Sequence, residues 1–167
     1  VYSSIDNIIK TLGDLKSSTL EELKSENYKS IIDYLGFEDI TFVLDLIILS
    51  QIKDYNIQEI AIEKHLDNFG ESYLALSTKA LIKDKLGKKD DAKKFYLKSL
   101  NLNSENSYTW NNLGYLYASQ FEDKKKAIDC YKKAILLNPN LIIARINLGV
   151  AYKEIGKIEK SKKEYLK

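Results

Sequence analysis

The chain has 167 residues, of which 44% are hydrophobic, and it carries a formal net charge of +2. A single cysteine, Cys130, excludes a fold held by internal disulfides and is compatible with a reducing, cytoplasmic location. The most apolar stretch, residues 42–49, is interrupted by Asp45 and is far shorter than the ~20 residues that a membrane-spanning helix needs. One Pro and seven Gly leave few positions that interrupt helices, so the composition favours an all-helical protein.

The charge is distributed unevenly along the chain. Residues 1–70 contain 13 Asp and Glu against 6 Lys and Arg, whereas residues 71–167 contain 11 against 20. The acidic and basic halves are expected to attract each other or different partners, unless they are simply two solvated helical surfaces.

Residues 1–72 show helical periodicity without a clear repeat signature. Apolar residues at helical spacing predict two helices before residue 36. A third helix, apolar on nearly all sides, is predicted over 39–53, and a fourth from a cap at Asn56 to a stop at Gly70. We interpret 1–72 as two helical hairpins that are either degenerate repeats or a helical cap.

Residues 73–106 form the first of three related units. Gly87 is placed at a turn between two helices, and Asp90 is a candidate cap of the second helix. Lys79 occupies the position that Leu113 holds in the next unit. Either its stem runs along an apolar surface with the charged end in water, or the helix is rotated.

The second unit, residues 107–141, contains the motif W-x2-L-G-x2-Y. The four residues of this motif are Trp110, Leu113, Gly114 and Tyr117. The pattern predicts one helix over 108–119 and a second that is capped by Asp123 and ends before Pro139. The loop at 120–122 is one residue longer than in the neighbouring units.

The third unit, residues 142–167, repeats this frame 35 residues later with arginine in place of tryptophan. Its matching residues are Arg145, Leu148, Gly149 and Tyr152. We expect its first helix to start near Ile142 with a cap at Asn140, and its turn to contain Gly156. Because the chain begins without Met and ends within an expected helix, we interpret it as a piece of a longer protein.

The period and the residue types resemble the tetratricopeptide repeat, a helix–turn–helix unit of about 34 residues. The resemblance implies an all-α fold in which repeats 73–106, 107–141 and 142–167 stack as a right-handed superhelix of antiparallel helix pairs. Small residues such as Gly114 and Gly149 are expected to let paired helices approach closely. The resemblance also implies a non-catalytic scaffold that binds a protein or peptide on its concave face, without a cofactor.

In this architecture the first helix of each unit lines the concave face, so its residues outside the packing side are candidates for binding a partner. They are Tyr108, Asn111, Asn112, Tyr115 and Ser119, then Ile143, Ile146, Asn147, Val150 and Lys153, and in the first unit Leu74, Ser77, Thr78, Leu81 and Asp84. Asn112 and Asn147 are predicted to hydrogen-bond to an extended peptide, unless they brace the helices. The apolar members offer contact area, unless an adjoining segment covers them.

One known binding mode of the family is tested directly by these positions. Heat-shock cochaperones that resemble this chain grip a partner's C-terminal carboxylate with Lys, Arg and Asn from three successive units. The matching positions hold Ser77 and Leu81, then Asn112, then Ile143 and Asn147, and only Asn112 agrees. We therefore expect a more neutral and apolar partner than a C-terminal carboxylate.

Two alternative functions stay open. The chain could be a regulatory or self-assembly segment of a larger protein or enzyme. It could also be a basic solenoid that contacts nucleic acid through second-helix lysines such as 124–126 and 132–133, although stacking aromatics are not interleaved with them.

Catalytic and metal chemistry find little support in the sequence. His65 stands alone, without a second ligand nearby, and Cys130 is interpreted as a half-buried structural thiol. We therefore predict no catalytic and no metal site.

Overall fold

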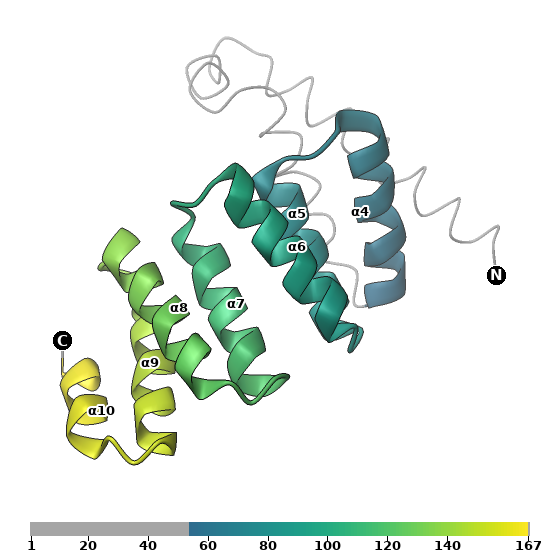
Figure 1. Cartoon of the computed structure of the whole chain (residues 1–167). Helices are drawn as coiled ribbons and strands as arrows, with labels where there is room; N and C mark the ends of the chain where they lie inside the picture. The colour runs from purple at the N-terminus through teal and green to yellow at the C-terminus, as the bar shows by residue number, and fades with distance from the viewer. Residues whose placement is uncertain (1–53, 167) are drawn as a thin grey trace, which may run out of the picture. The chain divides into compact units, whose positions relative to one another are not determined.

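A computed structural model describes residues 54–166, and the helices predicted before residue 54 lie outside this range (Figure 1). The contacts divide the chain into two units, 1–71 and 72–167. In the first, α4 (Tyr55–Phe69) begins after Asp54, whose carboxylate accepts a hydrogen bond from the Asn56 amide N–H at 2.8 Å. The predicted cap at Asn56 is therefore wrong, because Asp54 occupies the extended position that precedes the helix.

The second unit consists of three helix pairs joined by short turns (Figure 1). The pairs are α5 (Tyr73–Lys85) with α6 (Lys89–Leu102), α7 (Ser107–Ser119) with α8 (Lys124–Leu137), and α9 (Ile142–Glu154) with α10 (Ile158–Tyr165). The two helices of each pair pack against each other, and α7 contacts both α5 and α9. Within the described residues there are helices and no strands, so the expected all-α solenoid of antiparallel helix pairs is confirmed.

A small residue on the first helix meets a tyrosine ring on the second in the two later pairs. A Cβ added to Gly114 would lie 2.7 Å from Cε1 of Tyr131, and one added to Gly149 would lie 2.6 Å from Cε1 of Tyr165. Real Cβ atoms do not approach other atoms this closely, so a larger residue at either position forces something to move. The expected steric role of both glycines is confirmed.

The core is continuous from one pair to the next. Trp110 packs against two buried clusters, one containing Leu113 and one containing Leu141, and Tyr117 packs against the first of these and a third that contains Leu148. Each pair therefore buries its apolar side partly against its neighbours, as expected for helices too short to be stable alone.

Cys130 belongs to the cluster that contains Leu113 and is buried rather than half-buried. Burial raises the pKa of its thiol to about 12, with smaller contributions from Asp129 and Asp123. The thiol is protonated at neutral pH and is a weak nucleophile, which agrees with a structural role.

Side-chain caps are present at only some helix starts. Ser72, Asn106 and Asp123 accept hydrogen bonds from amides three residues later, at 3.1, 2.8 and 3.0 Å. The starts of α6, α9 and α10 have no such bond, so the caps predicted at Asp90 and Asn140 are wrong. Asp90 lies inside the first turn of α6, where its charge suits the helix dipole. Leu141, and not Asn140, is the residue that directly precedes α9.

The turns identify the extra residue of the middle unit as Phe121. A residue with positive φ follows each first helix: Gly87 at 74°, Glu122 at 52° and Gly156 at 76°. The closing backbone hydrogen bonds run from Lys88 to Lys83, from Asp123 to Tyr117 and from Lys157 to Tyr152, at 2.9, 2.9 and 2.8 Å. The middle bond spans one residue more than the other two, so Phe121 has no counterpart in the flanking units.

Arg145 makes the same hydrogen bond as the tryptophan it replaces. Nε1 of Trp110 donates to the carbonyl oxygen of Ser104 at 2.8 Å, six residues earlier. Nε and Nη2 of Arg145 donate to the carbonyl oxygen of Pro139 at 3.1 and 2.7 Å, also six residues earlier. Both side chains tie the start of their helix to the preceding loop.

Lys79 lies with its Nζ 4.4 Å from the centroid of the Phe95 ring. Its neighbour Ala80 is fully buried, as the repeat frame requires. Helix α5 therefore keeps the register of the other first helices, and Lys79 covers an aromatic ring with its charged end.

Candidate functional site

An exposed apolar surface runs along the first helices α7 and α9. Its members Tyr108, Tyr115, Ile143, Ile146 and Val150 have between 42% and 61% of their surface exposed. We call this set the first-helix face. The five residues lie on α7 and α9, two helices that contact each other, so the set spans two repeats.

Three asparagines connect α7 and α9 through side-chain hydrogen bonds. Nδ2 of Asn147 donates to Oδ1 of Asn111 at 3.0 Å, and Nδ2 of Asn111 donates to Oδ1 of Asn112 at 3.2 Å. Asn111 is only 6% exposed, so it lies in the contact between α7 and α9 and not on the open surface that the sequence predicted for it. Asn111 and Asn147 brace the helices, as the alternative interpretation allowed.

The bracing network still leaves polar atoms at its two ends. Asn112 uses its oxygen and Asn147 uses one N–H within the chain. Among residues 54–166, Nδ2 of Asn112 and Oδ1 of Asn147 have no hydrogen-bond partner, and both side chains are partly exposed. One end therefore offers donors and the other offers an acceptor.

A hollow of about 180 Å³ opens between α7, α8 and α9, and we call it the α7–α9 hollow. Four of its lining residues belong to the predicted set, namely Tyr115, Ser119, Asn147 and Val150. The other lining residues are Ala118, Lys124, Tyr131, Ala151 and Glu154. The hollow is far larger than the ~30 Å³ share of one water molecule, so it has room for a small side chain.

An ion pair lies at the edge of the α7–α9 hollow. Nζ of Lys124 is 2.6 Å from Oε2 of Glu154 and donates to the carbonyl oxygen of Ala118 at 3.0 Å. Sequence reasoning missed this pair, because Lys124 starts α8 and Glu154 ends α9, and only the packing of two repeats brings them together.

The remaining predicted residues take different positions. The hydroxyls of Ser77 and Ser119 donate within their own helices, to the carbonyl oxygens of Leu74 and Tyr115 at 2.9 and 2.8 Å. Asp84, which the sequence placed on the open side of its helix, is buried. Burial raises the pKa of its carboxyl group, an effect that Lys85 partly offsets.

Residues 54–166 contain no helix long and apolar enough to cross a lipid bilayer. In the same part of the chain, no three His, Cys, Asp or Glu side chains are grouped so that they could hold a metal ion.

Two segments of the chain match repeat families. Residues 73–106 match the family described as "Tetratricopeptide repeat", and residues 123–166 match a family described as "TPR repeat". Both segments are therefore tetratricopeptide repeats. The unmatched residues between these segments include α7, whose Trp110 and Gly114 make the contacts that the repeat frame predicts.

Solved structures of other proteins share this fold. The crystal structure of MamA superposes with a TM-score of 0.66 over 83% of this chain and 80% of that chain, at 24% identity. The first TPR of Spaghetti (RPAP3), bound to the HSP90 peptide SRMEEVD, superposes with a TM-score of 0.54 over 56% of this chain and 74% of that chain, at 26% identity.

A sequence relative is the uncharacterized protein ycf37 of Cyanophora paradoxa. The two chains are 36% identical over 105 residues, which are 60% of this chain and 55% of the relative. The chain thus spans about half the length of this relative.

Proposed function

We propose that this chain is a protein-interaction scaffold whose first-helix face binds an extended segment of a partner protein. The observation that carries the proposal is the exposed apolar surface set beside polar atoms at both ends of the asparagine network. Exposed apolar side chains grouped on one surface mark interaction sites more often than isolated ones do.

The asparagines suit a peptide backbone. An extended segment presents carbonyl oxygens and N–H groups along its edge, and Asn112 and Asn147 offer a donor and an acceptor, respectively. Because Asn111 holds both side chains in place, less conformational freedom is lost when the partner binds. An apolar side chain of the partner fits the α7–α9 hollow beside Tyr115 and Val150.

The complex of the RPAP3 repeat with its HSP90 peptide supports peptide binding by this fold. The partner expected here has a different chemistry, because Ser77, Leu81, Ile143 and Asn147 differ, position by position, from the Lys, Arg and Asn with which heat-shock cochaperones grip a C-terminal carboxylate. We therefore propose a neutral, apolar segment as the ligand of the first-helix face.

Peptide selection from a random library against the purified chain tests the proposal. The dissociation constant of a selected peptide is then measured by fluorescence anisotropy for the parent, for Asn112→Ala and for Val150→Glu. We expect at least tenfold weaker binding for Val150→Glu, because a carboxylate would be placed in the apolar contact. Lys133→Glu, an exposed change on α8, is the control and should leave the constant within about twofold.

The proposal is wrong if no peptide is selected, or if Val150→Glu binds every selected peptide as the parent does. Self-association is checked by light scattering over a range of concentrations. If the chain dimerises and Val150→Glu abolishes the dimer, the first-helix face belongs to a second copy of the chain instead.

A further inference from the structure

The turn between α7 and α8 carries a feature that the first-helix face does not explain. Phe121, the extra residue of the middle turn, packs against the core cluster that contains Tyr96 and Leu100. Its ring centroid lies 5.9 Å from that of Tyr117, and Nζ of Lys93 and Lys89 lie 4.5 and 5.3 Å from the ring centroid. An aromatic ring between a tyrosine and two lysines therefore fills this position against α6.

The corresponding position in the next repeat is open. A hollow of about 370 Å³, here called the α8–α10 hollow, has Ile128, Tyr152 and Ile155 among its lining residues. Tyr152 stands 35 residues after Tyr117, as Ile128 does after Lys93, so the two positions are equivalent in the repeat frame. The turn at Gly156 is one residue shorter than the middle turn. Ile155, which precedes Gly156, lines the hollow, so an aliphatic side chain is present at this turn and an aromatic ring is not.

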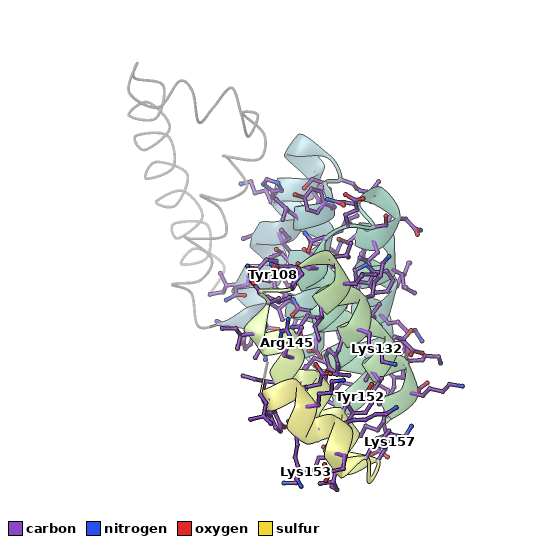
Figure 2. All side chains as sticks on the ribbon, turned by 90° about the vertical axis from the view of Figure 1, so that its left-hand side faces the viewer. Tyr108, Lys132, Arg145, Tyr152, Lys153 and Lys157 are labelled. Carbon is purple, nitrogen blue, oxygen red and sulfur yellow. The ribbon has the colours of Figure 1, made fainter. Side chains whose placement is uncertain are left out.

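Four lysines surround the α8–α10 hollow. They are Lys125, Lys132, Lys157 and Lys160, accompanied by the single carboxylate of Asp129. Within the described part of the chain none of the four forms an ion pair, and Nζ of Lys160 lies 5.8 Å from the centroid of the Tyr152 ring. In Figure 2, Lys132 and Lys157 lie toward the opposite side of the stack from Tyr108 of the first-helix face.

We propose that the α8–α10 hollow binds an aromatic side chain of a partner protein, carried by a short segment with acidic residues on both sides. The partner's ring would take the place that Phe121 takes one repeat earlier, with lysine ammonium groups close to it. The flanking carboxylates would pair with lysines that have no acidic partner in residues 54–166.

The same lysines fit a nucleic acid less well. Single-stranded RNA and DNA are held by basic grooves in which bases stack on exposed aromatic rings. Tyr152 is buried and is the one aromatic residue that lines the hollow, so no ring face is free for a base. An aromatic side chain that enters the apolar hollow needs no such face.

The probe for this proposal is the fluorescein-labelled synthetic peptide Glu-Asp-Phe-Glu-Asp, measured by anisotropy against the whole chain. We expect saturable binding that weakens at least tenfold when Phe is replaced by Ala in the peptide. The variant Lys132→Glu/Lys157→Glu should weaken binding to the same extent or more. The matched control Lys133→Glu/Lys163→Glu changes two exposed lysines that do not line the hollow and should weaken it less than threefold.

A second variant restores the missing residue by inserting Phe between Ile155 and Gly156. The inserted ring should occupy the hollow and abolish peptide binding while the helical circular dichroism is kept. If this insertion prevents folding, the lysine variants and the alanine peptide still decide the question.

Three results would overturn the proposal. The first is that the parent chain does not bind the peptide at low ionic strength. The second is that the alanine peptide binds equally well, which would show charge attraction alone. The third is that a short single-stranded RNA binds more tightly with the same dependence on Lys132 and Lys157. The last result would show that the lysines around the α8–α10 hollow bind the phosphates of a nucleic acid. None of them bears on the first-helix face, because Val150 and Asn112 lie outside the α8–α10 hollow.

Discussion

The helix pairs α7–α8 and α9–α10 share one close glycine–tyrosine contact and differ at their ends and turns. Gly114 and Gly149 both lie against a tyrosine ring of the second helix. In the middle pair, both helices have side-chain caps and Phe121 fills the space beside the turn. In the last pair neither helix has a side-chain cap, and the equivalent space is open. The shared contact builds the pair, whereas the ends and the turn determine how much surface stays available to a partner.

The largest expected effect is a loss of stability at Gly114 that exceeds the loss at Gly149. Gly114→Leu forces the Tyr131 ring to move, and this ring is only 2% exposed and held by the next repeat. Gly149→Leu meets Tyr165, which is 50% exposed and can move toward solvent. We expect the free energy of unfolding to fall by about 3 kcal/mol for Gly114→Leu and by about 1 kcal/mol for Gly149→Leu.

Urea denaturation followed by circular dichroism measures both losses. Gly87→Ala is a useful reference because its cost comes from positive φ and not from crowding. Equal losses for the two leucine variants would contradict the difference in packing between the middle and last pairs.

A smaller effect is expected at the tryptophan position. Trp110→Ala removes a hydrogen bond and a half-buried ring between two clusters, and we expect a loss of about 2 kcal/mol. Arg145→Ala removes hydrogen bonds with little apolar burial, and we expect about 1 kcal/mol.

The variant Trp110→Arg separates the contribution of the hydrogen bond from that of apolar packing in the same denaturation experiment. If it is more stable than Trp110→Ala, the hydrogen bond to the Ser104 carbonyl matters at both positions. Stability no better than that of the alanine variant would leave packing as the whole role of Trp110.

The smallest effect concerns the cap of α8. The hydrogen bond from the Lys126 amide, helped by the Lys126 side chain, lowers the pKa of the Asp123 carboxyl below its ordinary value of 3.8. The cap therefore stabilises the protein above the unfolded-state pKa, and this contribution is lost as the pH falls through the folded-state pKa. We expect Asp123→Ala to lower the melting temperature slightly at pH 7, with the difference narrowing below about pH 3.8.

Lys157→Ala is the counterpart in the last pair, where there is no side-chain cap to lose. Thermal melts of both variants at several pH values provide the comparison. A pH-independent difference for Asp123→Ala would show that the carboxylate does not act as the cap.

Much of the helix arrangement could be predicted from the sequence, because it depends on patterns that extend over whole helices. The frame of Trp110 and Gly114 fixed which side of α7 is buried, and Pro139 marked where α8 had to end. Caps at Asn56, Asp90 and Asn140 were predicted wrongly. A cap depends on the backbone conformation of one residue, and several polar residues near a helix start satisfy the same pattern.

The candidate site was harder to predict, because neighbouring repeats decide which side chains are covered. Helical periodicity separates the two sides of α7, yet it does not show that α9 approaches closely enough to bury Asn111. The pairing of Lys124 with Glu154 likewise depends on the angle between helices of different repeats. Phe121 was recognised only as part of a longer loop, since its packing against α6 has no signature in the sequence.

The exchange of Trp110 for Arg145 has a consequence for how such chains are recognised. In the last two repeats the position holds a long side chain whose N–H returns to a carbonyl group six residues upstream, whereas the first repeat has the buried Leu76 there. A motif search that demands an indole at this place would score α9 as a mismatch and undercount the repeats. A search that accepts arginine as well as the indole at this place would recover α9.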